Sequence, residues 1–177
     1  LPLKNLLEKI LPVLEEGKSL RTVSLNEEEQ KLLKGFQLLT IKPVLYVANV
    51  NEDGFESNQF LNQIYDLANE EGSEVVAICA ELEAEISGLT NAEKIEFLKE
   101  LGLEESGLDR LTRAGYKLLG LQTYFTAGEK EVRAWTINVG DSAPKAAGKI
   151  HTDFERGFIR AETVTFDYYI QNNGESK

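Results

Sequence analysis

The sequence contains no methionine, one cysteine and one histidine among its 177 residues. Because a chain without methionine does not include its own translation start, we expect it to be a fragment or a processed piece of a longer protein. A single cysteine excludes an internal disulfide framework and a cysteine-based metal site, so no metal site is expected here. No apolar run is long enough to cross a membrane, and no signal-peptide pattern opens the chain. We therefore expect a cytoplasmic protein with no membrane partner.

Basic side chains are also scarce. The chain has 19 Lys and Arg against 30 Asp and Glu, which gives a formal net charge of -11. Since nucleic-acid phosphates favour clustered Lys and Arg, this composition argues against a surface that coats nucleic acid. The acidic excess lies almost entirely in residues 1–120, whereas residues 121–177 are close to neutral. If any part of the chain binds RNA, the last third is the better candidate.

Apolar periodicity divides the chain into three regions. Residues 1–39 are predicted to form a helical arm with two helices, the first ending at Gly17 and the second beginning at Ser24, with Glu27 completing its cap. Leu32, Leu33 and Phe36 are expected to be buried by the second helix. The apolar repeat is too short to establish a coiled coil.

Residues 40–120 show the pattern of a parallel α/β unit. The segments 44–50 and 74–79 are nearly continuous apolar strands, and between them residues 57–70 are predicted to form a helix that buries Phe60, Leu61, Ile64 and Leu67. Strand, helix and strand at this spacing predict one βαβ unit. Further helices are expected after Thr90, capped with Glu93, and from Ser106 to Leu119.

Residues 121–177 change to the pattern of a small α+β domain. Residues 122–127 and 132–137 predict a hairpin across a short glycine-containing turn. Asp141 or Ser142 is expected to cap a short helix with Pro144 in its first turn, and residues 161–169 are predicted to form another strand.

Polar residues follow the ends of both predicted parallel strands. Asn49, Val50 and Glu52 come at the end of the first strand, and Cys79 and Ala80 at the end of the second. Ligands of doubly wound folds bind beyond the carboxyl ends of parallel strands, and an Asn amide can pair with one edge of a base. Asn49 to Glu52 resembles the Asn-Lys-x-Asp box of GTPases, with the longer Glu weakening selectivity for guanine. Taken alone, the string also fits an ordinary turn with Asn49 capping a strand, and Cys79 fits an inert core position.

The wider pattern resembles the YchF family of Obg-related P-loop proteins, which use Asn-x-x-Glu and prefer ATP to GTP. The resemblance rests on Lys42-Pro43 and Tyr46, on residues 49–55, and on Cys79-Ala80. Residues 122–128 and 150–161 resemble the TGS domain, which has a β-grasp fold. The resemblance implies a helical arm (1–39), the C-terminal half of a P-loop nucleotide-binding domain (40–120) and a TGS domain truncated at its C-terminus (121–177).

What the resemblance implies is an ATPase or GTPase that associates with the ribosome, particularly its large subunit. Asn49 and Glu52 would select the purine of ATP or GTP by hydrogen bonding, Val50 by packing, and Cys79 and Ala80 through backbone groups, with Mg²⁺ bound in the full-length protein. This chain lacks the phosphate loop, because seven residues separate Gly140 from Gly148-Lys149 and Ile150 stands where the motif needs Ser or Thr. We therefore expect it to be inactive alone.

Four cations of the last region form a candidate RNA-facing patch, equally well explained as solvated charges between acidic neighbours: Lys145, Lys149, Arg156 and Arg160. His151 has no obvious nucleophile beside it, so a structural or surface role is favoured over catalysis. The competing reading of the whole chain is an RNA- or ribosome-binding module without nucleotide chemistry.

Overall fold

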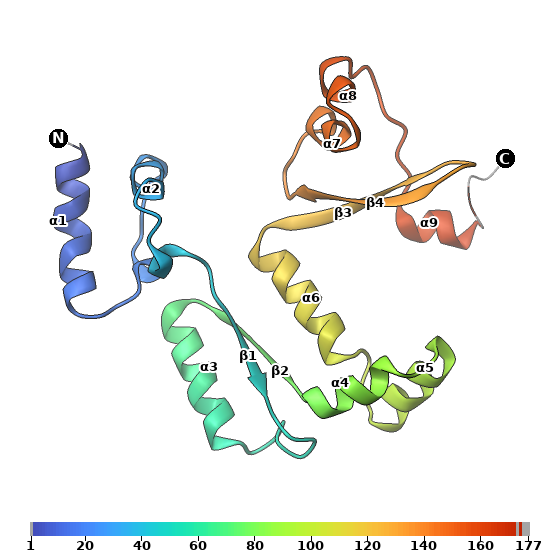
Figure 1. Cartoon of the computed structure of the whole chain (residues 1–177), viewed down its shortest axis with the longest axis horizontal. Helices are drawn as coiled ribbons and strands as arrows, with labels where there is room; N and C mark the ends of the chain where they lie inside the picture. The colour runs from blue at the N-terminus through green and yellow to red at the C-terminus, as the bar shows by residue number, and fades with distance from the viewer. Residues whose placement is uncertain (1, 173, 175–177) are drawn as a thin grey trace. The chain divides into compact units, whose positions relative to one another are not determined.

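The computed structural model describes residues 2–172 and 174, and the chain divides into two compact units, residues 1–119 and 120–177 (Figure 1). The first unit combines helices with a two-stranded parallel sheet, and the second combines helices with a two-stranded antiparallel sheet. In the described part of the chain, no helix has both the length and the apolar character needed to cross a bilayer.

The first unit opens with a small helical core. It is built from α1 (Pro2–Glu15), the 3₁₀ turn η1 (Leu20–Thr22), α2 (Glu27–Lys34) and a second 3₁₀ turn, η2 (Leu39–Ile41). Leu6 and Ile10 of α1 pack with Leu20 and Leu33, and all four side chains are buried. Gly17 follows α1 with φ of +71°, a left-handed conformation in which glycine ends a helix without strain, as its position in the sequence predicted.

The start of α2 corrects the sequence prediction. The cap is Asn26 and not Ser24: the Asn26 side chain accepts a hydrogen bond from the Glu29 backbone N–H, and the Glu29 carboxylate accepts one from the Asn26 N–H, both at 2.9 Å. Two overlapping capping patterns exist in this stretch, and tertiary contact selects the second, because Lys9 of α1 lies 2.9 Å from the Glu29 carboxylate. Leu33 is fully buried as expected, but Phe36 is largely exposed.

The predicted βαβ unit is confirmed. Strand β1 (Leu45–Asn49), helix α3 (Gln59–Glu71) and strand β2 (Glu74–Ile78) follow in order, and the strands pair in parallel from Leu45↔Glu74 to Asn49↔Ile78. Ala48, Ala77 and Leu61 form a buried cluster between the sheet and α3.

The buried face of α3 differs from the predicted one. Leu61 and Ala68 are buried and Ile64 packs against the same cluster, whereas Phe60 is 78% exposed and Leu67 is 45% exposed. The positions 61, 64 and 68 repeat at the spacing of one helical face, so contact with the sheet fixes which apolar residues are covered. Phe60 lies at the edge of that face, roughly 100° around the helix from Leu61, and its side chain stays outside the cluster.

Three further helices complete the first unit: α4 (Ala80–Ser87), α5 (Asn91–Glu100) and α6 (Gly107–Leu118). The predicted cap is confirmed for α5, where Thr90 and Glu93 form a reciprocal capping box. The predicted start of α6 at Ser106 is also confirmed, and there the Ser106 side chain accepts a hydrogen bond from the Asp109 N–H. Helix α4 begins directly after β2 and was not predicted separately.

The second unit contains the predicted hairpin. Strand β3 (Leu121–Ala127) pairs with β4 (Val132–Asn138) in antiparallel register, with Tyr124 opposite Trp135. Helices α7 (Ala143–Ile150), α8 (Thr152–Arg156) and α9 (Phe166–Gln171) follow. The Tyr124 hydroxyl donates to the Ala146 carbonyl at 2.9 Å, which ties the hairpin to α7.

The predicted strand over residues 161–169 is wrong. Residues 161–165 have no regular structure, and residues 166–171 form α9, where the Phe166 ring lies 5.7 Å from that of Phe125. A strand needs a neighbouring backbone to satisfy its N–H and C=O groups. Within residues 2–172 and 174, β3 and β4 pair only with each other, so this segment has no such neighbour. The described residues accordingly do not form a β-grasp sheet.

We expect Leu61→Ala to destabilise the first unit by about 2–5 kcal/mol, because the truncation leaves a cavity between α3 and the sheet. Leu67→Ala is the matched control on the same helix. Because the Leu67 side chain is already half-exposed, its truncation should lower the free energy of unfolding far less. Urea unfolding of the 177-residue chain followed by far-UV circular dichroism measures both. The single tryptophan, Trp135, lies in the second unit and its fluorescence should change little in either variant. An equal decrease in the free energy of unfolding for the two variants would contradict the packing described for α3.

Candidate functional site

The carboxyl ends of β1 and β2 meet at one edge of the parallel sheet. Asn49 is the last residue of β1 and pairs in register with Ile78, and the backbone N–H of Val50 donates to the Ile78 carbonyl at 2.8 Å. Beyond the strands, the Asn49 side-chain oxygen accepts a hydrogen bond from the Ala80 N–H at 3.0 Å. The topology therefore places the two predicted clusters of site residues side by side, joined by a direct bond.

This bond fixes how the Asn49 amide is oriented. The backbone N–H of Ala80 is a donor, so the atom that faces it must be Oδ1, and the NH₂ group points elsewhere. Asn49 is exposed, and in the described part of the chain its NH₂ group makes no hydrogen bond. The edge thus presents an oriented donor to solvent. The Ala80 N–H, which was predicted to serve a ligand, is already used by Asn49.

Val50 and Glu52 differ in how much of each side chain is exposed to solvent. Val50 is half-buried and packs against the cluster of Ala48, Leu61 and Ala77, so part of its apolar surface is committed to the core. Glu52 is exposed in a turn closed by a hydrogen bond from the Gly54 N–H to the Asn51 carbonyl, at 2.9 Å. Its carboxyl group has no ion-pair or hydrogen-bond partner among the residues that the structure describes, which leaves it available to a ligand.

Cys79 and Ala80 form the junction between β2 and α4. Cys79 is buried, as expected for an inert core thiol, and it occupies the position before α4 without capping the helix through its side chain. Ala80 is exposed and is the first residue of α4. Its backbone N–H is one of the helix-terminal groups that lack a partner within the helix, and the Asn49 oxygen supplies that partner.

Two residues of this edge were missed by sequence reasoning. Glu83 of α4 is buried and accepts hydrogen bonds from the backbone N–H groups of Gly107, at 2.6 Å, and Leu108, at 3.2 Å. Arg110 of α6 donates to the Ala77 carbonyl at 3.1 Å. The one available signal was the position of Glu83 on the same helical face as Ile86, where an apolar residue is the normal occupant.

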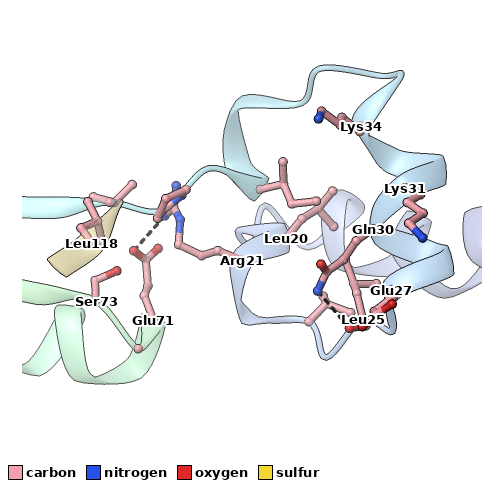
Figure 2. Close-up of a pocket in the computed structure, with 15 residues that line it drawn as sticks. Leu20, Arg21, Leu25, Glu27, Gln30, Lys31, Lys34, Glu71, Ser73 and Leu118 are labelled. Atoms are coloured by element: carbon pink, nitrogen blue, oxygen red, sulfur yellow. Dashed lines mark hydrogen bonds and ion pairs between the residues drawn. The ribbon is translucent and has the colours of Figure 1, made fainter. Parts of the chain in front are cut away.

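A pocket of about 840 Å³ lies at the opposite end of the sheet (Figure 2). Pro43 and Val44, which precede β1, and Ser73, which precedes β2, contribute to its lining. In Figure 2, Glu71, Ser73 and Leu118 lie on one side and residues of η1 and α2 on the other. Because ligands of doubly wound sheets bind beyond the carboxyl ends of the strands, this pocket is not the predicted base site.

A polar network crosses one wall of that pocket. The Glu71 carboxylate accepts hydrogen bonds from the Tyr46 hydroxyl at 2.7 Å, from the Ser19 hydroxyl at 3.0 Å and from the Arg21 guanidinium at 2.9 Å. The Tyr46 hydrogen bond, followed by those of Ser19 and Arg21, holds the pKa of Glu71 below its ordinary value. The network links the helical core of residues 2–41 to the βαβ unit.

In the second unit, the four predicted RNA-facing cations are all exposed. Lys145 and Lys149 lie one turn apart on α7, and Lys145 is 4.0 Å from Asp141. Arg156 ends α8 and Arg160 follows it, near the exposed acidic residues of α8. Their role in RNA binding stays a prediction.

His151 has a structural use in the same unit. Its Nδ1 accepts a hydrogen bond from the Asp153 N–H at 3.2 Å, so the imidazole caps α8. This contact gives the side chain a role that requires no catalysis, in line with the sequence interpretation.

Comparison with known proteins places nearly the whole chain beside one family. It is 57% identical over 172 residues to "Ribosome-binding ATPase YchF" of Pasteurella multocida, covering 97% of this chain and 47% of that protein. The proteins of the same name in Escherichia coli O157:H7 and Bacillus subtilis are 59% and 52% identical, each over 96% of this chain and 47% of its own length. The chain thus spans about half the length of these relatives.

A solved structure and a family model agree with this placement. "Structure of the Schizosaccharomyces pombe YchF GTPase" matches with a TM-score of 0.78 and 37% identity, covering 88% of this chain and 42% of that one. Residues 121–177 match the family model YchF-GTPase_C, described as "Protein of unknown function (DUF933)".

The Glu71 network predicts a defined pH dependence of stability. Because the folded-state pKa of Glu71 is depressed below 4.5, its contribution is fully present above pH 4.5 and is lost as the pH falls through the folded value. Glu71→Gln should lower stability at neutral pH, and its deficit relative to the wild type should shrink below pH 4.5. Urea unfolding followed by circular dichroism at a series of pH values tests this. Glu70→Gln, at an exposed neighbouring position, is the control. If the stability lost in Glu71→Gln is the same at every pH, the lowered pKa assigned to Glu71 is wrong.

Proposed function

The chain is a YchF homologue over 97% of its length, and we propose that it supplies the base-recognition half of the nucleotide-binding domain of a ribosome-binding ATPase. In this proposal residues 1–39 are the helical arm, residues 40–120 the C-terminal half of the nucleotide domain and residues 121–177 the TGS domain with its β-grasp sheet incomplete. The observation that supports base recognition most directly is the 3.0 Å bond between the Asn49 oxygen and the Ala80 N–H, because it leaves an oriented amide donor at the exposed strand ends.

Asn49 and Glu52 bind different atoms of the base in this proposal. The Asn49 NH₂ group donates to a purine ring nitrogen, an acceptor that adenine and guanine share, so it selects purines without separating them. The Glu52 carboxylate accepts from exocyclic N–H groups. Because it is exposed and has no partner among the described residues, it adjusts to the amino group of adenine. The length of the Glu52 side chain, one methylene more than Asp, gives the preference for ATP over GTP in this proposal.

Val50, Cys79 and Ala80 support this arrangement in different ways. Val50 offers the base the part of its side chain that the core leaves uncovered. Cys79 anchors the strand end in the core, and the Ala80 N–H orients Asn49, so Ala80 acts through Asn49 and not by donating to the base. The base preference remains part of the proposal, since the bacterial relatives are named ATPases and the fission yeast structure a GTPase.

The residues present fit a base and do not fit the triphosphate or Mg²⁺. The sequence has no phosphate loop, and among residues 2–172 and 174 no group of three His, Cys, Asp or Glu side chains is placed to hold a metal ion. When bound, Mg²⁺ neutralises charge on the transferring phosphoryl group. That chemistry belongs to the rest of the full-length protein, and this chain alone is inactive in the proposal.

A second candidate function is a cytoplasmic RNA- or ribosome-binding module, which the exposed cations of α7 favour. Lys145 and Lys149 lie on one face, and with Arg156 and Arg160 they would meet RNA of the large ribosomal subunit. If Asn49→Ala and Glu52→Ala leave nucleotide-dependent ribosome association of the full-length protein unchanged, this reading is the better one.

Asn49→Asp separates the two uses of the Asn49 side chain. Aspartate retains an oxygen acceptor for the Ala80 N–H but loses the NH₂ donor, so ATP binding by a full-length YchF protein carrying this segment should weaken by about tenfold or more. The Ala80 amide should stay protected from hydrogen exchange. Asn51→Asp adds the same charge within the adjoining turn and is the matched control. Unchanged ATP affinity in Asn49→Asp, measured by calorimetry, would remove Asn49 from the site.

Glu52→Asp tests the origin of base preference. Shortening the side chain by one methylene should move the ratio of ATP to GTP affinity toward GTP by about tenfold, the scale of one good bidentate contact. Glu52→Gln is the companion variant, and it should weaken the binding of both nucleotides because its neutral amide offers one acceptor oxygen where the carboxylate offers two. Equilibrium binding of both nucleotides to the full-length protein gives the ratio. A ratio that does not move in Glu52→Asp would show that another residue reads the base.

A further inference from the structure

Glu83 is a buried carboxyl group one turn after the start of α4. The residue is 9% exposed, and its backbone N–H donates to the Cys79 carbonyl at 3.0 Å within the first turn of the helix. Its two carboxyl oxygens accept from the N–H groups of Gly107, at 2.6 Å, and Leu108, at 3.2 Å. These N–H groups belong to the first turn of α6, where the helix itself provides no partner. Glu83 therefore joins α4 to the start of α6.

Gly107 allows this junction to be close. A Cβ atom at this position would lie 2.8 Å from Glu83 Oε1 and 2.9 Å from Ile78 Cγ2, closer than real Cβ atoms approach other groups. Helix α6 therefore comes into contact both with α4 and with the last residue of β2. A larger residue would displace one of them.

Arg110 provides a second bond between α6 and β2. Its guanidinium donates to the Ala77 carbonyl at 3.1 Å, and its Nε is buried without a hydrogen-bond partner among the described residues. A buried donor without a partner costs free energy, and the bond to the strand carbonyl offsets part of the cost of burying this guanidinium. Helix α6 thus bonds β2 just before its end, at Ala77, and α4 just after it, at Glu83.

The segment held between these two bonds is the one that orients Asn49. Ile78, Cys79 and Ala80 lie between Ala77 and Glu83 in the sequence, and the Ala80 N–H sets the direction of the Asn49 amide. We propose that Glu83 is a positioning residue for base recognition, which acts through α6 and the Ala80 N–H and does not touch the ligand. This inference rests on the proposed function of Asn49.

The chemistry of Glu83 makes the role specific to a carboxyl group. Two backbone donors need two acceptors, which Glu83 supplies from one side chain. A glutamine of the same shape offers one acceptor and turns an NH₂ group toward the other N–H. One buried donor then loses its partner, and the start of α4 shifts to relieve the repulsion.

The test compares Glu83→Gln with Glu85→Gln in a full-length YchF protein carrying this segment. Glu85 lies on the same helix but is exposed, so its substitution makes the same change of charge away from α6. We expect Glu83→Gln to weaken ATP binding by about tenfold and to raise the hydrogen-exchange rate of the Ala80 amide, while binding of inorganic tripolyphosphate, which has no base, changes by less than about twofold. Glu85→Gln should match the wild type. Gly107→Ala, which disturbs the same junction without removing a charge, should repeat the pattern of Glu83→Gln.

Two results would overturn the inference. One is wild-type ATP affinity in Glu83→Gln; the other is a parallel loss of ATP and tripolyphosphate binding together with a lower melting temperature, which would make Glu83 a general stability residue. The Asn49→Asp variant separates this failure from that of the proposed function. If Asn49→Asp weakens ATP binding and Glu83→Gln does not, only the role of Glu83 is lost, whereas no effect in Asn49→Asp removes the base site itself.

Discussion

The hydrogen bond from the Ala80 N–H to the Asn49 side-chain oxygen is the constraint on which the candidate site depends. It joins the last paired residue of β1 to the first residue of α4, directly after the end of β2. It satisfies a donor at the start of α4 that the helix leaves unpaired, and it determines which half of the Asn49 amide faces outward. One contact thus completes a helix start, joins two strand ends and orients a donor. The sequence allowed two interpretations of residues 49–52, an ordinary turn capped by Asn49 or a loop that binds a base. In the structure one side chain can serve both, since the Asn49 oxygen caps the strand end and its NH₂ group stays exposed.

The two ends of the βαβ unit are stabilised by different means. At the amino ends of the strands, Glu71 collects hydrogen bonds from Tyr46, Ser19 and Arg21 in a charged network whose strength depends on pH. At the carboxyl ends, the bonds run mainly to the backbone: Asn49 to Ala80, and Glu83 to the first turn of α6. Backbone groups cannot change rotamer, so bonds to them hold a site more rigidly than pairs of long side chains do. The pocket lies at the first end, and the side-chain bonds to backbone groups lie at the second.

Local signals were sufficient for the parts of the fold that depend on local physics. Apolar runs located β1, β2 and the hairpin, and Thr90 and Ser106 marked helix starts correctly. The errors arose where distant contacts decide between local alternatives. Lys9 selects Asn26 over Ser24 as a cap, and packing against the sheet buries Leu61 but leaves Phe60 exposed on α3.

The same limit applies to the site and to the second unit. The meeting of the two strand ends followed from topology, but the use of the Ala80 N–H by Asn49 did not, because it depends on a side-chain conformation. Glu83 looks like any other acidic residue of a charged helix until α6 places two N–H groups against it. Residues 161–169 alternate in the manner of a strand, yet a strand exists only with a partner, and no pattern within a segment reveals whether the partner is there.

The contacts that shape the candidate site all lie within one compact unit. Asn49, Ala80, Glu83, Gly107 and Arg110 belong to β1, α4 and α6, and each bond among these elements stays within residues 45–118. The cations proposed to meet RNA lie in the other unit, within residues 145–160. The bond that orients Asn49 and the cations proposed to meet RNA therefore involve different residues of the chain, and each set can be changed by substitution without altering the other.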